Sequence, residues 1–306
     1  MITTPTDTSW LTTGRYVSDG GLETDLIFNR GIELAEFASF PLVESDHGRA
    51  VLRDYYDGYA EVARRAGVGL TLEAPTWRAN PDWGARVGYD HAALDRVNRA
   101  AIEFLDGLRA SYSDLADVRT IGTIGPRGDG YVSSGEVDPE EAAEYHRLQV
   151  EAFAAAGVDV VAAYTIPSAN EALGISRAAR RAGVPVLVGF TVETDGRLPD
   201  GSALRDAVAL VDAQEPPDGF IVNCAHPTHI ASALDEGEWL GRIVQVNPNA
   251  STLSHAELDE AEELHAGDIG LLVTSCATLR ERLPALSIVG GCCGTDARHV
   301  AALWGV

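Results

Sequence analysis

Two hydrophobic patterns alternate along the chain. Short runs rich in β-branched residues end in Gly, Asn, Thr or Pro, and each is followed by a longer Ala-, Arg- and Glu-rich stretch with helical spacing. The short runs predict buried strands and the longer stretches predict helices. Eight strand segments occur in order, at residues 16–21, 68–76, 118–126, 158–165, 184–193, 220–225, 242–249 and 286–293.

The segments between them carry helix signals. Residues 138–157 begin with Asp138 and Pro139, which suit the N-cap and the first turn of a helix. Residues 49–67 end in Gly67, which suits a C-cap. Segments 170–183 and 296–306 follow the same pattern. The first helix places an apolar stripe on one face, formed by Val51, Tyr55, Tyr59 and Val62.

Eight strand–helix alternations in 306 residues predict an α/β fold, a single (β/α)8 TIM barrel. An open doubly wound sheet is the alternative. Such a sheet normally carries G-x-G-x-x-G after an early strand, whereas this chain has "SDGGLETD" at 18–25. No linker, repeat or low-complexity segment divides the sequence. We therefore expect one domain over residues 1–306.

The amino-acid composition limits the class of protein and the compartment in which we expect it. Hydrophobic residues make up 45% of the chain and charged residues 23%, which is typical of a soluble globular protein. No run of apolar residues is long enough to span a bilayer, and the first residues do not resemble a secretory signal. Four cysteines, two of them adjacent, are unlike an extracellular disulfide framework. We expect a cytoplasmic protein with reduced thiols and no membrane partner.

The charge balance excludes further classes. The formal net charge is −23, and all 23 basic residues are arginine. An acidic surface of this kind repels phosphate backbones, so we expect no nucleic-acid partner. Without lysine, the chain has neither a Schiff-base lysine nor the lysine of a P-loop.

Candidate chemistry lies at the predicted strand ends, because the loops after barrel strands converge on one face. Three of the four cysteines, Cys224, Cys292 and Cys293, follow the sixth and eighth strands, so we expect their sulfur atoms to meet. Adjacent residues of a strand point to opposite faces, and the glycines around the Cys pair allow the bend that convergence needs. The other strand ends contain Asp19–Gly21, Glu73–Thr76, 125–126, 164–165, Glu193 and 247–249.

Three thiolates at one rim favour zinc, and three protein ligands leave a fourth position open for substrate. Two other interpretations are a buried, apolar Cys224 and a redox pair at 292–293. We interpret Cys276 as a packing residue. "CAHPTH" at 224–229 suggests further metal ligands, but solvated loop histidines are commoner. We expect no metal ligation by His226, His229, His255 or His299.

Four motifs together resemble the homocysteine S-methyltransferase family: "DGGLET" at 19–24, "GTIGP" at 122–126, "VNC" at 222–224 and "GGCCGT" at 290–295. The resemblance covers nearly the whole chain. It implies a homocysteine-binding (β/α)8 barrel that holds Zn²⁺ through Cys224, Cys292 and Cys293. It also implies methyl transfer from a small-molecule donor to the zinc-bound thiolate of homocysteine, giving methionine. Folate- and betaine-using relatives carry additional domains or a C-terminal extension, so we expect a sulfonium donor, S-methylmethionine or S-adenosylmethionine.

The same resemblance suggests substrate-binding residues. Asp19 with the backbone amides of Gly20 and Gly21 would hold the amino-acid part of the acceptor, although Asp19 is also a candidate N-cap of a tight turn. Thr76 falls where the family often has a threonine, and Asn223 would orient the neighbouring zinc ligand. Trp77 or Tyr131 would line the donor pocket.

One position departs from the family pattern. Many members carry "ETIP" after the fourth strand, with a glutamate for the acceptor's amino group, whereas this chain reads "YTIP" with Tyr164 in that place. A phenol is neutral at pH 7, so Glu73 or Glu193 would have to supply the charge. The change leaves two alternatives open: another thiol or selenol acceptor, and a non-enzymatic zinc or redox protein.

Overall fold

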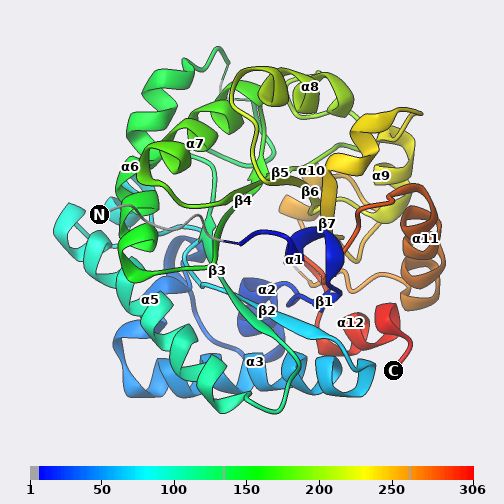
Figure 1. The fold of residues 1–306 in the computed structure, drawn as a ribbon. Helices are drawn as coiled ribbons and strands as arrows, with labels where there is room; N and C mark the ends of the chain where they lie inside the picture. The colour runs from blue at the N-terminus through cyan, green and yellow to red at the C-terminus, as the bar shows by residue number, and fades with distance from the viewer. Residues whose placement is uncertain (1–6, 134, 262) are drawn as a thin grey trace.

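The computed structural model describes residues 7–133, 135–261 and 263–306. Within these residues eight parallel strands close into a barrel in chain order, with β1 paired to both β2 and β8 (Figure 1). The predicted fold is confirmed. The strands are β1 Tyr16–Val17, β2 Gly69–Glu73, β3 Val118–Ile124, β4 Val160–Ile166, β5 Val186–Phe190, β6 Gly219–Asn223, β7 Ile243–Asn247 and β8 Ile288–Val289.

All eight strands fall where the sequence predicts them, but most are shorter. The predicted segments include Gly, Pro and Asn residues that leave the sheet and enter the loops above it. The segment 286–293, for example, yields only the two-residue β8 before the chain turns. The residues with candidate chemistry therefore lie on loops at the carboxyl ends of the strands.

Helices separate the strands and surround the barrel (Figure 1). The C-cap predicted at Gly67 is confirmed by its φ of 65°, and the Asp138 side chain accepts the backbone N–H groups of Glu140 and Glu141. The helices are α1 Trp10–Thr13, α2 Leu22–Thr24, α3 Asp46–Ala66, α4 Pro81–Arg86, α5 His91–Ser111, α6 Pro139–Ala156, α7 Ala169–Ala182, α8 Leu204–Gln214, α9 Pro227–Ala233, α10 His255–Asp259, α11 Ile269–Arg282 and α12 Ala297–Trp304. Shorter 3₁₀ and π segments are Asp25–Asn29, Ala35–Phe37, Phe40–Glu44 and Glu238–Arg242.

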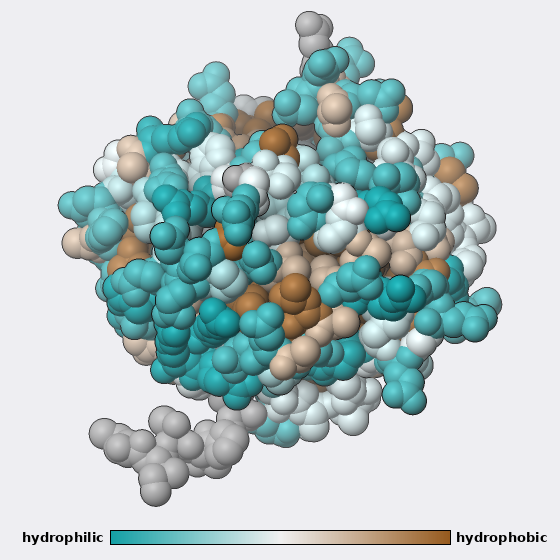
Figure 2. All heavy atoms as spheres, turned by 90° about the horizontal axis from the view of Figure 1, so that it is seen from above, coloured by the Kyte–Doolittle hydropathy of each residue, from teal (hydrophilic) through white to brown (hydrophobic). Residues whose placement is uncertain are grey.

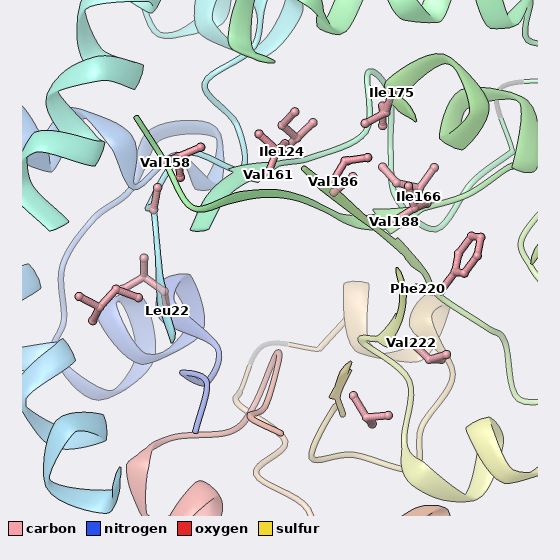
Figure 3. Packing of buried hydrophobic residues seen from close by; sticks show 14 of the residues in the cluster. Leu22, Ile124, Val158, Val161, Ile166, Ile175, Val186, Val188, Phe220 and Val222 are labelled. Atoms are coloured by element: carbon pink, nitrogen blue, oxygen red, sulfur yellow. The ribbon is translucent and has the colours of Figure 1, made fainter. Parts of the chain in front are cut away.

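Side chains of successive strand residues alternate between two apolar layers. Val160 and Ala162 of β4 belong to the cluster inside the barrel, whereas Val161 and Ala163 belong to the layer between strands and helices. Figure 3 shows this outer layer, where Val161 and Val188 lie with Ile175 of α7. The inner cluster also contains Trp10 and Leu11 of α1, so this helix packs against the interior near the amino ends of the strands.

The face of the molecule drawn in Figure 2 is largely polar. Figure 2 shows one face on which hydrophilic residues dominate and apolar residues form small groups between them. No helix in the described part of the chain is long and apolar enough to cross a membrane.

Candidate active site

The backbone of Cys224 is held in an unusual conformation directly after β6. Its φ is 55°, in the left-handed region that costs a non-glycine residue free energy. Two hydrogen bonds fix it there: the Cys224 N–H donates to the carbonyl of Asn247 over 2.9 Å, and the His255 ring donates to the Cys224 carbonyl over 2.7 Å. Neighbouring elements, β7 and α10, thus set the direction of the thiol.

The Cys292–Cys293 pair follows β8 on a tight turn. A Cβ at Gly290 would collide with the carbonyl oxygen of Asp19, and Gly294 has a φ of 77°. The turn is tied to the loop after β7, because Cys292 N–H donates to the Pro248 carbonyl over 2.8 Å and Cys293 accepts from Ala250 N–H over 3.1 Å. The bend that the flanking glycines predict is present.

The turn brings the three sulfur atoms together. The Sγ atoms of Cys224, Cys292 and Cys293 all lie within 4.8 Å of one another. Sulfur atoms around one tetrahedral zinc ion, with bonds of about 2.3 Å, lie about 3.8 Å apart, so the residues fit that metal. The Tyr131 hydroxyl lies 3.0 Å from the Cys224 sulfur, and the Asn249 amide donates to the same sulfur over 3.9 Å.

The three thiols titrate as a unit. Hydrogen bonds from Cys292 and Cys293 hold the pKa of Cys224 well below its usual range, and the same contacts raise the pKa of both partners. The cluster therefore favours one thiolate, at Cys224, and opposes ionisation of the other two thiols. A bound cation removes this opposition.

These sulfurs open onto a cavity of about 430 Å³. That volume suits a small-molecule site. Most of the predicted site residues line it together with the three cysteines: Asp19, Gly20, Gly21, Glu73, Tyr164 and Asn223. Trp77 and Tyr131 line it too.

Two predicted residues do not line this cavity. The Thr76 side chain is fully buried, and its hydroxyl donates to the Thr123 carbonyl over 2.8 Å. Glu193 turns toward α10 and accepts from the His255 ring over 2.7 Å. Of the two glutamates considered for the charge missing at Tyr164, only Glu73 reaches the cavity.

Three other predicted residues have hydrogen-bonding groups that bond within the protein. The N–H groups of Gly20 and Gly21 already donate to the Tyr55 hydroxyl and the Thr295 carbonyl, so they do not offer free donors to a carboxylate. The Asn223 side chain bonds Thr165 and makes no hydrogen bond to Cys224. The amide oxygen of Asn223 accepts the backbone N–H of Thr165 over 3.0 Å, and its amide nitrogen donates to the Thr165 hydroxyl over 2.7 Å. Thr165 lies at an irregularity in the β4–β5 pairing.

Asp19 is also not an N-cap, since Gly21 holds that position of α2. Asp19 and Glu73 instead form a buried acidic pair. Glu73 Oε1 accepts hydrogen bonds from Ser18, from the Tyr164 hydroxyl over 2.6 Å and from Gln245 over 3.0 Å.

Burial raises the pKa of both carboxyls, and repulsion from Glu73 adds to the rise at Asp19. Neither carboxylate forms an ion pair with any described residue. The empty cavity therefore opposes ionisation of this pair, and a cationic ligand beside it would favour the ionised form.

The interpretation of the histidines as solvated is wrong for three of them, although none belongs to the metal-capable group. His226, His299 and His255 are buried. His255 bridges Glu193 and the Cys224 carbonyl, and its ring stacks on Tyr131 with centroids 4.1 Å apart. Sequence reasoning missed this role, because it depends on how the loop after β7 folds back over β6.

Cys276 packs in α11, as expected, and burial raises the pKa of its thiol to about 12. Cys276 does not belong to the three-thiol cluster, so a Cys276 variant is the matched control for variants of the other three cysteines.

The barrel brings a three-thiol cluster and a buried acidic pair to one cavity at the carboxyl ends of its strands, where enzymes of this fold carry their active sites. Residues 16–305 match the family model described as homocysteine S-methyltransferase. The chain belongs to this family, and the protein is a methyltransferase.

Individual relatives are distant but match along almost their whole length. The chain is 28% identical over 307 residues to homocysteine S-methyltransferase of Escherichia coli strain K12, covering 93% of each. It is 23% identical to selenocysteine Se-methyltransferase of Brassica oleracea var. italica, covering 95% of this chain and 88% of the relative.

Among solved structures, the oxidized and metallated forms of the E. coli homocysteine methyltransferase MmuM superpose with a TM-score of 0.73, at 24% identity. Each match covers 98% of this chain and 99% of that one. These two structures share the fold of this chain.

Proposed function

We propose that the protein transfers a methyl group from a sulfonium donor, S-methylmethionine or S-adenosylmethionine, to the thiolate of homocysteine, giving methionine. In this proposal Zn²⁺ is held by Cys224, Cys292 and Cys293. One observation carries it: three sulfurs within 4.8 Å of one another face a cavity that also contains two buried carboxylates.

The bound metal would keep the acceptor sulfur deprotonated at neutral pH and fix its position. The donor is already a cation, and its leaving group is a neutral thioether, so no general acid is needed. The chain's own residues then have to orient the two substrates and exclude water, which in favourable systems lowers a barrier by about 7–11 kcal/mol. The His255 ring and the Asn247 carbonyl contribute to this orientation because their hydrogen bonds hold Cys224 in place.

Glu73 takes over the role of the glutamate that Tyr164 replaces. The Tyr164 hydroxyl donates to Glu73 over 2.6 Å. The carboxylate of Glu73, at the end of β2, therefore lies next to position 164, where many family members have their glutamate. An ammonium group placed between Asp19 and Glu73 would relieve their repulsion and desolvation. A homocysteine acceptor is therefore compatible with tyrosine at position 164.

The direct test is an assay with zinc-loaded protein, homocysteine, and S-methylmethionine, S-adenosylmethionine or betaine as the donor. We expect methionine from at least one sulfonium donor and little from betaine. Cys276→Ser should keep this activity and Cys292→Ser should lose it. The proposal is wrong if homocysteine is never methylated while selenocysteine or another thiol turns over. It is also wrong if the metal-free protein merely cycles a disulfide between Cys292 and Cys293.

A further inference from the structure

Arg78 places a positive charge in the cavity that the proposed chemistry does not yet use. It follows Trp77 on the loop after β2 and lines the same cavity as the cysteines. Its guanidinium carbon lies 3.4 Å from the ring centroid of Trp83 and 4.3 Å from that of Trp77. Two indole rings thus hold the guanidinium.

This guanidinium has no fixed counter-ion. Its Nε and Nη1 atoms are buried without a hydrogen-bond partner, and Arg78 forms no ion pair with any residue that the structure describes. Burial lowers its pKa to about 10, so it stays charged at neutral pH. Arg78 is half-buried, and a charged group in such a place without a fixed partner costs free energy, in a chain with 46 acidic residues that could supply one.

Two carboxylates that line the same cavity act on Arg78 without forming an ion pair with it. Asp129 and Glu23 are the carboxylates whose charges act most on Arg78. Asp129 accepts the backbone N–H of Tyr131 over 2.7 Å, and Glu23 accepts the Ser39 hydroxyl over 2.6 Å. The acidic pair Asp19–Glu73 is not among the groups that act most on Arg78.

The cavity therefore contains an acidic pair without a counter-ion among the described residues and, on the loop after β2, a guanidinium near Glu23 and Asp129 that no ion pair with those residues satisfies. On the side of the sulfurs, Asp19 and Glu73 suit an ammonium group. On the side of the β2 loop, the Arg78 guanidinium suits a carboxylate, which it can bind through a charge-assisted hydrogen bond. Trp77 and Tyr131 line the cavity as well and offer aromatic faces to a cation such as a sulfonium.

We propose that Arg78 binds the carboxylate of the methyl donor, so that the site selects an amino-acid sulfonium over a sulfonium without a carboxylate. The acceptor is assigned to the other side because its sulfur has to reach the cysteine cluster and its ammonium group the acidic pair. This inference rests on the proposed function and adds the residue that selects the donor.

The test compares S-methylmethionine with its decarboxylated analogue, (3-aminopropyl)dimethylsulfonium, in wild type and in Arg78→Met. For the wild type we expect kcat/KM to fall about 10- to 100-fold when the donor lacks the carboxylate, the range for a charge-assisted hydrogen bond. Arg78→Met should lose a similar factor with S-methylmethionine and little more with the analogue. The KM for homocysteine should stay within about twofold.

Arg86→Met is the matched control. Arg86 stacks on the same Trp83 ring at 4.4 Å, but it is exposed, pairs with Glu36 over 3.2 Å and does not line the cavity. It should keep wild-type kinetics with both donors. The inference is overturned if the two variants lose activity alike, if Arg78→Met raises the homocysteine KM instead, or if Arg78→Met still discriminates between the donors.

A binding measurement separates this inference from the proposed function. Calorimetry with S-methylmethionine and no acceptor should show affinity weakened about tenfold or more in Arg78→Met, with Arg78→Lys in between because lysine keeps the charge and loses the planar group that lies on the two indole rings. Unchanged affinity overturns the role of Arg78 even if methyl transfer occurs. Absence of methyl transfer, with this difference in affinity present, overturns the proposed function alone.

Discussion

The charged side chains at the two ends of the barrel differ in whether they form ion pairs. Near the amino ends of the strands, the Tyr16 hydroxyl donates to Asp117 over 2.6 Å, Arg119 pairs with Asp117 over 2.9 Å, and Arg109 pairs with Asp159 over 2.5 Å. At the carboxyl ends, Asp19, Glu73 and Arg78 line the cavity, and none of them forms an ion pair within the described part of the chain.

The difference separates stability from function. Paired charges help to hold strands and helices together, whereas buried charges without partners cost free energy. A fold retains such a cost where a ligand supplies the missing partner. The amino end should therefore respond to mutation through stability, and the carboxyl end through binding and turnover.

The largest effect should come from the sulfurs. Cys224→Ser, Cys292→Ser or Cys293→Ser should each lose most of the zinc and more than about 100-fold of the activity, since changes to groups that only support ligands already cost about 10–100-fold. Metal analysis and the methionine assay measure both losses. Cys276→Ser should be unaffected in both. Zinc lost only from Cys276→Ser would refute the ligand assignment.

The next effect concerns recognition of the acceptor. Glu73→Gln should raise the KM for homocysteine about 10- to 100-fold, because the ammonium group loses a charged partner. Tyr164→Phe should raise it less, about three- to tenfold, because it removes only one hydrogen bond to Glu73. Steady-state kinetics with the donor saturating measures both variants. A larger effect at Tyr164 than at Glu73 would contradict the role given to Glu73.

Asp19→Asn should lose activity and gain stability. Burial raises the pKa of Asp19 in the folded protein, so the folded state holds this proton more tightly than the unfolded chain. The wild type therefore loses stability as the pH rises above about 4, the pKa of an unfolded aspartate. The variant should melt about 2–4 °C higher than the wild type at pH 7, a shift that corresponds to roughly 1 kcal/mol.

The difference in melting temperature between Asp19→Asn and the wild type should disappear as the pH falls to about 4. Thermal denaturation of the metal-free proteins between these pH values measures it. A variant that melts below the wild type at pH 7 would show that the Asp19 charge stabilises the fold.

The smallest effect should come from the amino end. Asp117→Asn removes the partner of Tyr16 and Arg119, and a partly exposed pair of this kind contributes about 1 kcal/mol or less. The free energy of unfolding should fall by that amount, with kcat and both KM values unchanged. A change in either KM would mean that the two ends of the barrel are coupled.

The sequence predicts the barrel and the meeting of the sulfurs for a physical reason. Strand ends of a closed parallel barrel share one rim, so Cys224 and the pair at 292–293 lie on the same side of the barrel, and the glycines around the pair allow the turn that brings the sulfurs together. The roles of Arg78 and His255 depend instead on loop conformation. Arg78 lies against Trp83 of α4, and His255 folds back from α10, contacts that no spacing in the sequence indicates.

The same limit explains the residues that do not take their expected place. Thr76 and Glu193 follow strands β2 and β5 as expected, but their side chains turn to Thr123 and His255 rather than to the cavity. The register of a strand end predicts which rim a residue reaches. It does not predict which neighbour the side chain then contacts.

X-ray absorption at the zinc edge, on zinc-loaded protein with and without homocysteine, tests the central claim most directly. With three cysteine ligands and one open position, we expect three sulfur neighbours plus one lighter atom without homocysteine, and four sulfur neighbours with it. A sulfur count that stays the same on addition of homocysteine would contradict the account, because the acceptor thiol would then not be activated at these cysteines.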